Sequence, residues 1–235
     1  SGEIMKMKFE HQTVELPKIK QKNNALPDGG RGYETPEGKL YPSITTVLSV
    51  RNKKGLHEWR KRVGEDVANY IARTAANRGT AVHKMCEDYL NNQHLAWPSE
   101  FEKHKSKNFL AWCMFAQMRD ILENINNVKC LETSLYSDTM GIAGQVDCIA
   151  EYKGKLSVID FKTSTKERKD DYNENYYIQT CAYSYMFEER TGQKAEQCVI
   201  LVVTQDGTVQ EFIKQRDDYI PLLNDAIEEW NKRSK

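Results

Sequence analysis

The chain has 235 residues, of which 39% are hydrophobic and 29% charged, which is typical of a globular protein with one large domain or one domain with appendages. It contains 34 basic and 34 acidic residues, so its bulk charge gives no support for nucleic-acid binding, and such a site would depend on local patches. No apolar run is long enough to predict a membrane span. The six cysteines are scattered without a CxxC pair, which argues against zinc ribbons and an iron–sulfur cluster and favours a reducing compartment.

The N-terminal part is predicted to be an arm that precedes a single domain. Residues 1–40 are polar and rich in turn residues, which predicts a loose arm with one hairpin, residues 31–34 and 39–41 flanking the Pro36 turn. A helix is expected to start after Pro42, with Ser43 as its N-cap. Residues 41–235 are expected to form the domain, with a helical part over 41–125 and a sheet core over 126–235.

Helical periodicity dominates the first half of the domain. Residues 55–92 carry apolar residues at spacings of three and four, and Arg78-Gly79-Thr80 is expected to divide them into two helices. The first has the apolar stripe Trp59, Val63, Val67, Tyr70 and Ile71, and the second has Val82, Met85, Cys86, Tyr89 and Leu90. Trp97-Pro98 ends this pattern, and residues 101–124 predict another helix.

Strands dominate the second half. They are expected over residues 128–136, 145–152, 156–163, 198–204 and 209–214, with helices over 175–190, ending near Gly192, and over 218–233. Helices first, then a sheet with one inserted helix, predict an α/β or α+β fold in which helices flank a central mixed sheet.

The most informative stretch is the hairpin formed by residues 145–152 and 156–163. Lys153-Gly154 predicts a tight turn, because glycine allows the positive φ that such a turn needs. Centring the turn on this pair places Asp147 directly opposite Asp160, with Cβ atoms about 5 Å apart. Lys162 lies on the same face as Asp160 because strand side chains alternate. Two adjacent carboxylates repel unless a cation lies between them, so the hairpin predicts a divalent-metal site beside a lysine.

Two helical pairs are candidates to join this site. His83 and Glu87 are four residues apart on one helix face, and both residue types bind divalent ions. For the pair alone, a solvated polar helix face is the favoured interpretation. Combined with the hairpin residues, the pair favours a metal site. Gln179 and Tyr183 repeat the spacing, and an amide and a phenol can hold a phosphate or a base edge. Judged by residue type alone, a surface glutamine beside a core tyrosine is the simpler interpretation.

A local basic cluster offers a path for a nucleic-acid strand. Residues 51–54 and 57–62 combine Lys and Arg with Trp59, which suits phosphate attraction and base stacking on single-stranded DNA. Trp59 fits a core position equally well. Ser43 and Thr45 are candidates to donate to a phosphate or to cap a helix.

The ordered set of motifs resembles the PD-(D/E)XK nucleases, specifically their RecB-like branch. The likeness runs over about residues 41–212 and is carried by Asp147, by Asp160-Phe161-Lys162, by Gln179 to Tyr183 and by His83 after Arg78-Gly79-Thr80. It implies a restriction-endonuclease-like core. Asp147 is preceded by valine rather than proline, a departure that the RecB-like branch tolerates.

The resemblance implies a role for each matching residue. Asp147, Asp160, His83 and the backbone carbonyl of Phe161 would hold the metal. Lys162 would orient or help deprotonate the attacking water and stabilise the phosphorane charge, and Glu87 would support the site or a second, weaker ion. The expected DNA contacts are Gln179, Tyr183, Arg78, Ser43, Thr45, Trp59 and Ser164.

The sequence therefore predicts a Mg²⁺-dependent DNA exonuclease that prefers single strands and acts in replication, repair or recombination, with Mn²⁺ as a substitute ion. The alternatives are an endonuclease or double-strand end resector of the same fold, and a non-catalytic nucleic-acid-binding module. The expected partner is DNA, without a membrane, and the chain is expected to be a monomer. The expected location is an intracellular reducing compartment, either host cytoplasm for a phage-encoded protein or mitochondrial matrix for an organellar one whose leader has been removed.

Overall fold

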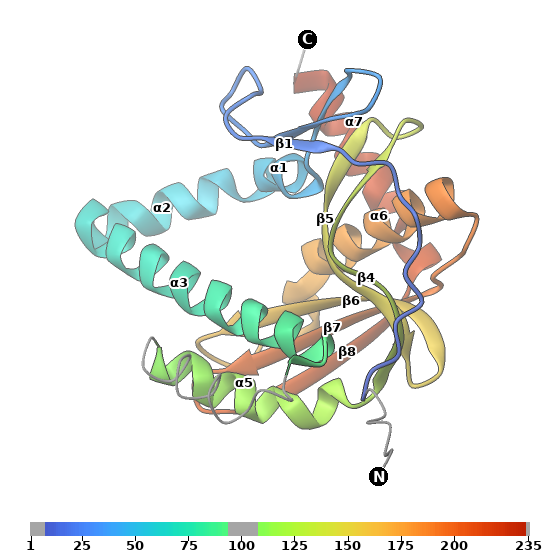
Figure 1. Ribbon diagram of the computed structural model, residues 1–235. Helices are drawn as coiled ribbons and strands as arrows, with labels where there is room; N and C mark the ends of the chain where they lie inside the picture. Colours follow the sequence, from blue (N-terminus) through green and yellow to red (C-terminus); the bar gives the residue numbers. More distant parts are fainter. Residues whose placement is uncertain (1–7, 94–107, 234–235) are drawn as a thin grey trace.

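A five-stranded sheet forms the centre of the computed structural model, which describes residues 8–93 and 108–233 (Figure 1). Its strands lie in the order β4 (Ile125–Ser137), β5 (Ile142–Tyr152), β6 (Lys155–Ser164), β7 (Gln197–Thr204) and β8 (Val209–Gln215). β6 and β7 are parallel, and the other neighbouring pairs are antiparallel. The predicted strands and the mixed sheet are confirmed. No helix in the described part of the chain is long and apolar enough to cross a membrane.

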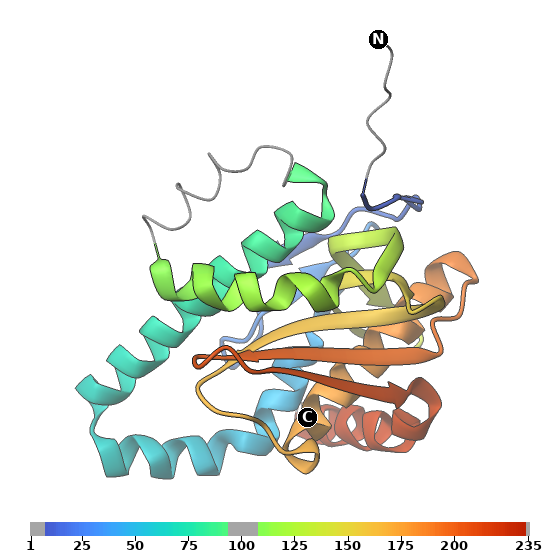
Figure 2. The ribbon, with the colours of Figure 1, turned by 90° about the horizontal axis from the view of Figure 1, so that it is seen from below.

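Helices cover both faces of the sheet, as Figure 2 shows from a second direction. On one face, α5 (Phe109–Leu122) and the second half of α3 (Glu65–Leu90) pack against β5, β6 and β7. On the other face lie α1 (Ile44–Ser49), α6 (Glu174–Thr191) and α7 (Ile220–Arg233). Three 3₁₀ turns complete the described structure, at Val50–Asn52, Asp170–Asn173 and Arg216–Tyr219. Gly192 ends α6 with a φ of 76°, which confirms the predicted helix end.

In its described part, residues 8–40, the N-terminal arm contains the predicted hairpin and packs against the domain. β2 (Gly32–Glu34) and β3 (Leu40–Pro42) pair around the Pro36 turn, and β1 (Lys20–Lys22) adds a third strand. Phe9 and Tyr33 are 2% and 1% exposed, so the described part of the arm contributes to the core. Composition alone missed this because two buried aromatic rings outweigh the many turn residues around them.

The predicted division of the long helical region is wrong. α2 (Lys53–Val63) ends at Gly64, whose φ of 91° is unfavourable for other residues, and α3 then runs without a break through Arg78-Gly79-Thr80. Gly79 serves a different purpose, because a Cβ there would lie only 3.3 Å from the Thr163 hydroxyl on β6. Its missing side chain lets α3 approach the sheet closely.

α2 and the first half of α3, residues 53–77, extend away from the sheet, and we call this segment the α2–α3 projection (Figure 1). The predicted apolar stripe follows it but is not core, since no residue of α2 is buried. Val67, Tyr70 and Ile71 are 52%, 62% and 44% exposed. Trp59 and Val63 are half-buried. In contrast, the stripe of the second half of α3, from Val82 to Leu90, is buried as predicted.

Two of the expected boundaries cannot be compared with the structure. The break at Trp97-Pro98 and the start of the helix predicted over residues 101–124 lie outside the described residues. The end of that helix agrees well, because α5 ends at Leu122.

Candidate active site

The predicted register of the β5–β6 hairpin is confirmed. Its pairs run from Tyr152↔Lys155 at the turn to Cys148↔Ile159, and Lys153 and Gly154 both have positive φ, 49° and 81°. Asp147 and Asp160 lie one step beyond the last regular pair, where the two strands separate.

The Asp147 carboxylate accepts a backbone hydrogen bond from β6 just beyond the end of the β5–β6 ladder. Its Oδ2 accepts a hydrogen bond of 2.9 Å from the backbone N–H of Phe161. Asp147 and Asp160 are 9% and 3% exposed. Burial raises the pKa of Asp147 well above its usual range, and the neighbouring Asp160 carboxylate raises it further. The two carboxylates are therefore close together, as predicted, and their burial disfavours the charged form.

Lys162 lies beside Asp160, as the strand alternation requires. Its Nζ is 2.9 Å from Asp160 Oδ2, and its side chain is 22% exposed. Burial lowers the pKa of Lys162, but the carboxylates of Asp160 and Asp147 more than reverse this, so the net shift is upward. The amine is held as a cation.

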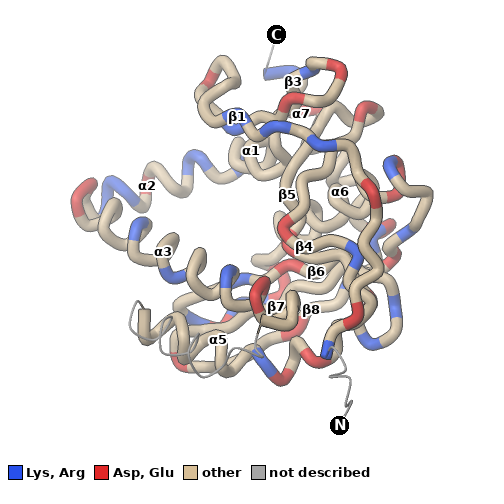
Figure 3. The backbone as a smooth tube through the Cα atoms, viewed as in Figure 1, with Lys and Arg blue, Asp and Glu red and all other residues tan. Residues whose placement is uncertain are grey.

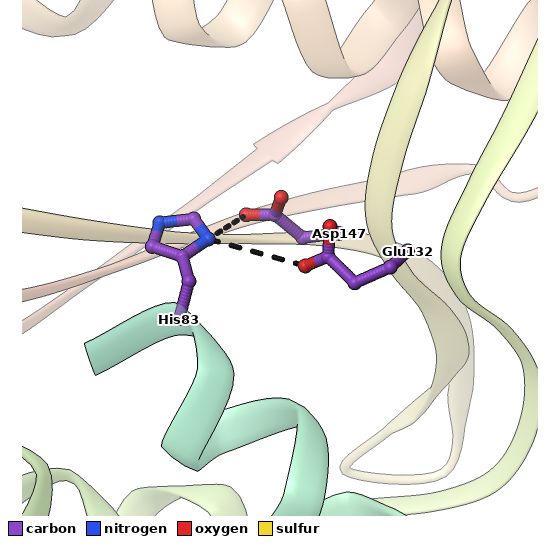
Figure 4. Close-up of side chains that lie close together, drawn as sticks. All are labelled: His83, Glu132 and Asp147. Atoms are coloured by element: carbon purple, nitrogen blue, oxygen red, sulfur yellow. Dashed lines mark ion pairs between the residues drawn. The ribbon is translucent and has the colours of Figure 1, made fainter. Parts of the chain in front are cut away.

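His83 reaches the carboxylates from the second half of α3 (Figure 4). Its Nδ1 lies 3.6 Å from Asp147 Oδ2 and 4.0 Å from an oxygen of Glu132. Burial lowers the pKa of His83, although Asp160 and the facing backbone of Phe161 act in the opposite direction. A lowered pKa favours neutral imidazole, which is the form that binds a metal.

Glu132 of β4 belongs to this cluster, and the sequence reasoning missed it. The neighbouring pairs Leu131↔Cys148 and Thr133↔Val146 set Glu132 opposite Asp147. Its φ of 45° is rare for a residue other than glycine. Burial raises the pKa of Glu132 to about 7, with further contributions from Glu87 and Asp160.

The signal for Glu132 was present in the sequence. The β4–β5 turn falls at residues 138–141, between the paired Ser137 and Ile142, and Gly141 has a φ of 65°. The register argument used for the β5–β6 hairpin would have placed Glu132 opposite Asp147 if it had been applied to this second turn.

The donor set fits a divalent cation. His83, Glu132 and Asp147 each offer one ligand atom, and these atoms lie within 4.8 Å of one another. Asp160 Oδ2 is buried and accepts no hydrogen bond of good geometry, despite the nearby Lys162 amine. Carboxylate oxygens suit Mg²⁺ and Mn²⁺, and a neutral imidazole adds one nitrogen donor to the set. A cation would relieve the crowding of the carboxylates. Acidic positions gather where the second half of α3 meets the sheet (Figure 3).

The structure brings most of the predicted metal ligands together, with one addition. Asp147, Asp160 and His83 converge, and the backbone of Phe161 faces the His83 ring. Glu132 is the addition. Glu87 lies beside the cluster, where its charge raises the pKa of Glu132, and its carboxylate is 4.0 Å from the Lys84 amine.

Gln179 and Tyr183 face the site from α6, and both are buried, with Gln179 8% exposed. Tyr183 is 2% exposed, and its hydroxyl accepts a hydrogen bond of 3.0 Å from the Gln179 amide. A Cβ at Gly144 would lie 2.7 Å from the Tyr183 ring, so glycine is needed on the facing strand β5. The core alternative therefore describes Tyr183 best, and the phenol orients Gln179 instead of reaching outward.

A pocket of about 200 Å³ adjoins Lys162 and Gln179. The side chains around it are mainly polar, and they include Thr45, Asn52, Asn175 and Tyr176. Thr45 is exposed and accessible from this pocket. Ser43 is 2% exposed, and its hydroxyl accepts from the Thr46 N–H as the N-cap of α1, so the capping alternative describes it.

The remaining predicted DNA contacts are spread over three elements. The Ser164 hydroxyl donates to the Lys166 carbonyl at 2.6 Å. Arg78 is 8% exposed, and its two terminal nitrogens lie 3.0 and 3.1 Å from the Gln205 side-chain oxygen in the amide orientation that satisfies both groups. Its Nε is buried without a hydrogen-bond partner. Trp59 lies on the α2–α3 projection, separate from the carboxylate cluster.

Fold and site together define the class of protein. The model of the PD-(D/E)XK nuclease superfamily matches residues 55–234, which include every residue of the carboxylate cluster. The chain belongs to the PD-(D/E)XK nuclease superfamily, as the motifs predicted.

Within this class, the chain is similar to curated relatives named mitochondrial genome maintenance exonuclease 1. The human protein is 29% identical over 182 residues, which cover 72% of this chain and 51% of that protein. The Xenopus tropicalis protein is 28% identical over 186 residues, covering 71% and 49%. The chain thus spans about half the length of the curated relatives it matches. A crystal structure of a putative exonuclease from Eubacterium rectale gives a TM-score of 0.46 at 16% identity, covering 68% of this chain and 66% of that one.

Proposed function

We propose that the chain is a divalent-metal-dependent DNA exonuclease that acts on single-stranded ends. The observation that carries the proposal is the meeting of five groups at one end of the β5–β6 ladder: the carboxylates of Asp147, Asp160 and Glu132, the His83 imidazole and the Lys162 ammonium. The names of the relatives support nuclease action on DNA ends and a role in DNA maintenance.

His83, Glu132, Asp147 and Asp160 are the residues that would hold the ion, and Mg²⁺ is the ion we propose, with Mn²⁺ as a substitute. When bound, such an ion supplies a water of lowered pKa and neutralises charge on a phosphate. The residues of the chain itself keep the ligands in place. The Phe161 N–H fixes one oxygen of Asp147, and the β5–β6 register fixes Asp160 beside it.

Lys162 contributes a fixed positive charge beside the ion. Its Nζ lies 2.9 Å from Asp160 Oδ2, and an ammonium at this place is suited to stabilise negative charge on a phosphate in the transition state. The alternative role is to orient or help deprotonate the attacking water.

The α2–α3 projection supports a single strand as substrate. α2 carries five Lys or Arg residues against one Glu in the sequence KKGLHEWRKRV. Trp59 and the exposed Tyr70 supply aromatic surface beside this charge. Exposed rings and basic side chains together bind unpaired bases and phosphates, whereas duplex DNA offers few unstacked bases. Thr45 and Gln179 are the proposed contacts nearer the ion.

Six free cysteines, five of them buried, agree with a reducing compartment, which we propose as the place of action.

Cleavage of blocked oligonucleotides tests the proposal. Linear single strands with 5′ or 3′ blocks, the matching duplexes and a covalently closed single-stranded circle are incubated with Mg²⁺, beside the Asp160→Ala variant. We expect degradation of linear single strands with at least one free end, an intact circle and no activity in the variant. Cleavage of the circle would assign an endonuclease, preference for duplex ends would assign a resector, and binding without cleavage or ion uptake would assign a non-catalytic module.

A further inference from the structure

Lys162 has a second neighbour that no motif identifies, the ring of Tyr176. This residue lies in the first turn of α6, and its ring is half-buried. Lys162 Nζ lies over the ring, 4.4 Å from its centroid. The amine is therefore held between the Asp160 carboxylate, 2.9 Å away, and an aromatic face.

The ring itself is held by a second cation. The Arg168 guanidinium carbon lies 4.8 Å from the Tyr176 ring centroid. Arg168 is fixed in turn, because its side chain donates to the Asn173 side chain at 2.6 Å and to the Tyr172 carbonyl at 3.0 Å. Its backbone N–H donates to the Gln210 side chain at 2.8 Å, and its carbonyl accepts from the same amide at 2.9 Å. The ring is thus part of a well-anchored loop.

An aromatic face suits a lysine that must keep its charge. The negative face of the ring attracts an ammonium group, with a strength that rises when the pair is shielded from water. A further carboxylate in this position would neutralise the amine and compete with a phosphate for it. The ring limits the movement of the long lysine chain without adding a negative charge.

We propose that Tyr176 is a positioning residue for Lys162, and that its ring holds the ammonium where a scissile phosphate meets the carboxylate cluster. The inference rests on the proposed function and extends it to a residue outside the motif set. The ring acts through Lys162 and not as a stacking surface for a base, since both cations already lie over it.

A substitution series separates the ring from the hydroxyl and from the substrate. Tyr176→Phe keeps the aromatic face, whereas Tyr176→Leu and Tyr176→Met keep apolar volume without it. Tyr172→Leu is the matched control, because Tyr172 is four residues away and 70% exposed, with Lys169 at 5.9 Å from its ring. We expect kcat on linear single-stranded DNA to fall about tenfold in the Leu and Met variants and to stay within about twofold of wild type in the Phe variant. KM should change less than about twofold throughout.

Three outcomes would overturn the inference: unchanged kcat in both the Leu and Met variants, a rise in KM or in the Kd for DNA at constant kcat, or a Phe variant as impaired as the Leu variant. Thermal melts of each variant identify any that fails to fold, and the Leu and Met variants serve as substitutes for each other.

An NMR measurement tests the contact between Lys162 and the Tyr176 ring without a cleavage assay. In protein labelled with ¹³C-lysine, the ε-methylene signal of Lys162 is assigned by its loss in Lys162→Arg. We expect ring currents to shift this signal upfield in wild type and Tyr176→Phe, and the shift to vanish in Tyr176→Leu. Its absence in wild type would overturn the inference whatever the activity. A normal shift in a protein that cleaves no DNA would instead count against the proposed function.

Discussion

Carboxylates lie at two places along the β4–β5 hairpin, at its turn and in its middle, and they differ in how many hydrogen-bond donors surround them. At its turn, Glu189 of α6 accepts hydrogen bonds from the Ser137 hydroxyl at 3.0 Å and from the Asp138 and Thr139 N–H groups at 2.9 and 3.3 Å. The Arg190 guanidinium pairs with it at 2.5 Å. Burial works against this charge, but the hydrogen bonds prevail and lower the pKa of Glu189 to about 2.

In the middle of the same hairpin, Glu132 and Asp147 face each other with few donors. The pKa of Glu132 is raised to about 7 by burial and like charge, and that of Asp147 is raised well above its usual range. Asp147 receives one backbone N–H, and Asp160 retains a buried oxygen without a good hydrogen bond. The carboxylate at the turn is satisfied by several protein donors, whereas the three in the middle share one lysine ammonium, that of Lys162, which leaves room for a further cation.

The largest expected effect is the loss of DNA cleavage when Asp160 or Lys162 is replaced. Asp160→Asn and Lys162→Ala should each lower the rate of DNA cleavage by about a thousandfold or more, because both remove charge from the proposed reaction centre. DNA binding should stay measurable by fluorescence anisotropy. Lys155→Ala, at an exposed position of the same strand, is the control and should cleave normally. Near-normal cleavage by Lys162→Ala would refute its role.

Metal affinity tests whether Glu132 belongs with the ligands. Glu132→Gln should weaken Mn²⁺ binding by about tenfold to a hundredfold, since one negative donor is lost while the contact with Gln145 can persist. Isothermal titration calorimetry measures this, with the exposed Glu37→Gln as control. An unchanged Kd would show that Glu132 only borders the site.

Stability should respond to the other carboxylate. Glu189→Gln should lower the free energy of unfolding by about 1 to 2 kcal/mol at pH 7, because several charge-assisted hydrogen bonds weaken. The folded pKa of about 2 is below the ordinary value of 4.5, so this contribution is complete above pH 4.5 and is lost as pH falls through 2. Urea unfolding of wild type and variant between pH 3 and 7 should therefore show converging stabilities at the acid end.

The control for this variant is Glu196→Gln, whose carboxylate is 71% exposed and 3.8 Å from the Lys194 amine. It should change stability little at any pH. A Glu189→Gln deficit that stayed constant down to pH 3 would mean that packing, and not charge, explains the loss.

The smallest effect is stabilisation by the ion itself. A free Mg²⁺ concentration about five times its Kd should raise the free energy of unfolding by about 1 kcal/mol in wild type, because the ion binds the folded chain. Asp160→Asn should gain less. Differential scanning fluorimetry with and without EDTA measures the change, with Ca²⁺-free buffer throughout. Equal gains in both proteins would place the ion elsewhere.

Local signals explain what could be predicted. Lys153-Gly154 fixed the β5–β6 register, and with it the relation of Asp147 to Asp160, because a two-residue turn leaves no freedom in the pairing. The cap at Ser43 and the helix end at Gly192 are also local events. The superfamily followed from the order of the motifs.

The predictions failed where contacts with distant parts of the chain determine helix boundaries and burial. Gly64 and Gly79 look alike in sequence, but one ends a helix and the other lets a helix approach β6. The stripe around Val67 and Tyr70 has the spacing of a core face, and only the tertiary structure reveals that nothing in the described chain covers it. Tyr183 could not be assigned to core or substrate until its hydrogen bond to Gln179 was known.

The unbroken course of α3 has a mechanical consequence. Ile71 on the exposed projection and His83 in the ligand set belong to one rod, with about 18 Å between them at the rise of an α-helix. On the proposed function, a DNA strand that tilted or steadied the outer end of this rod would also tilt or steady the imidazole at its inner end. We then expect substrate binding and ion binding to be coupled reciprocally, and the Kd for Mn²⁺ with and without a bound oligonucleotide measures that coupling.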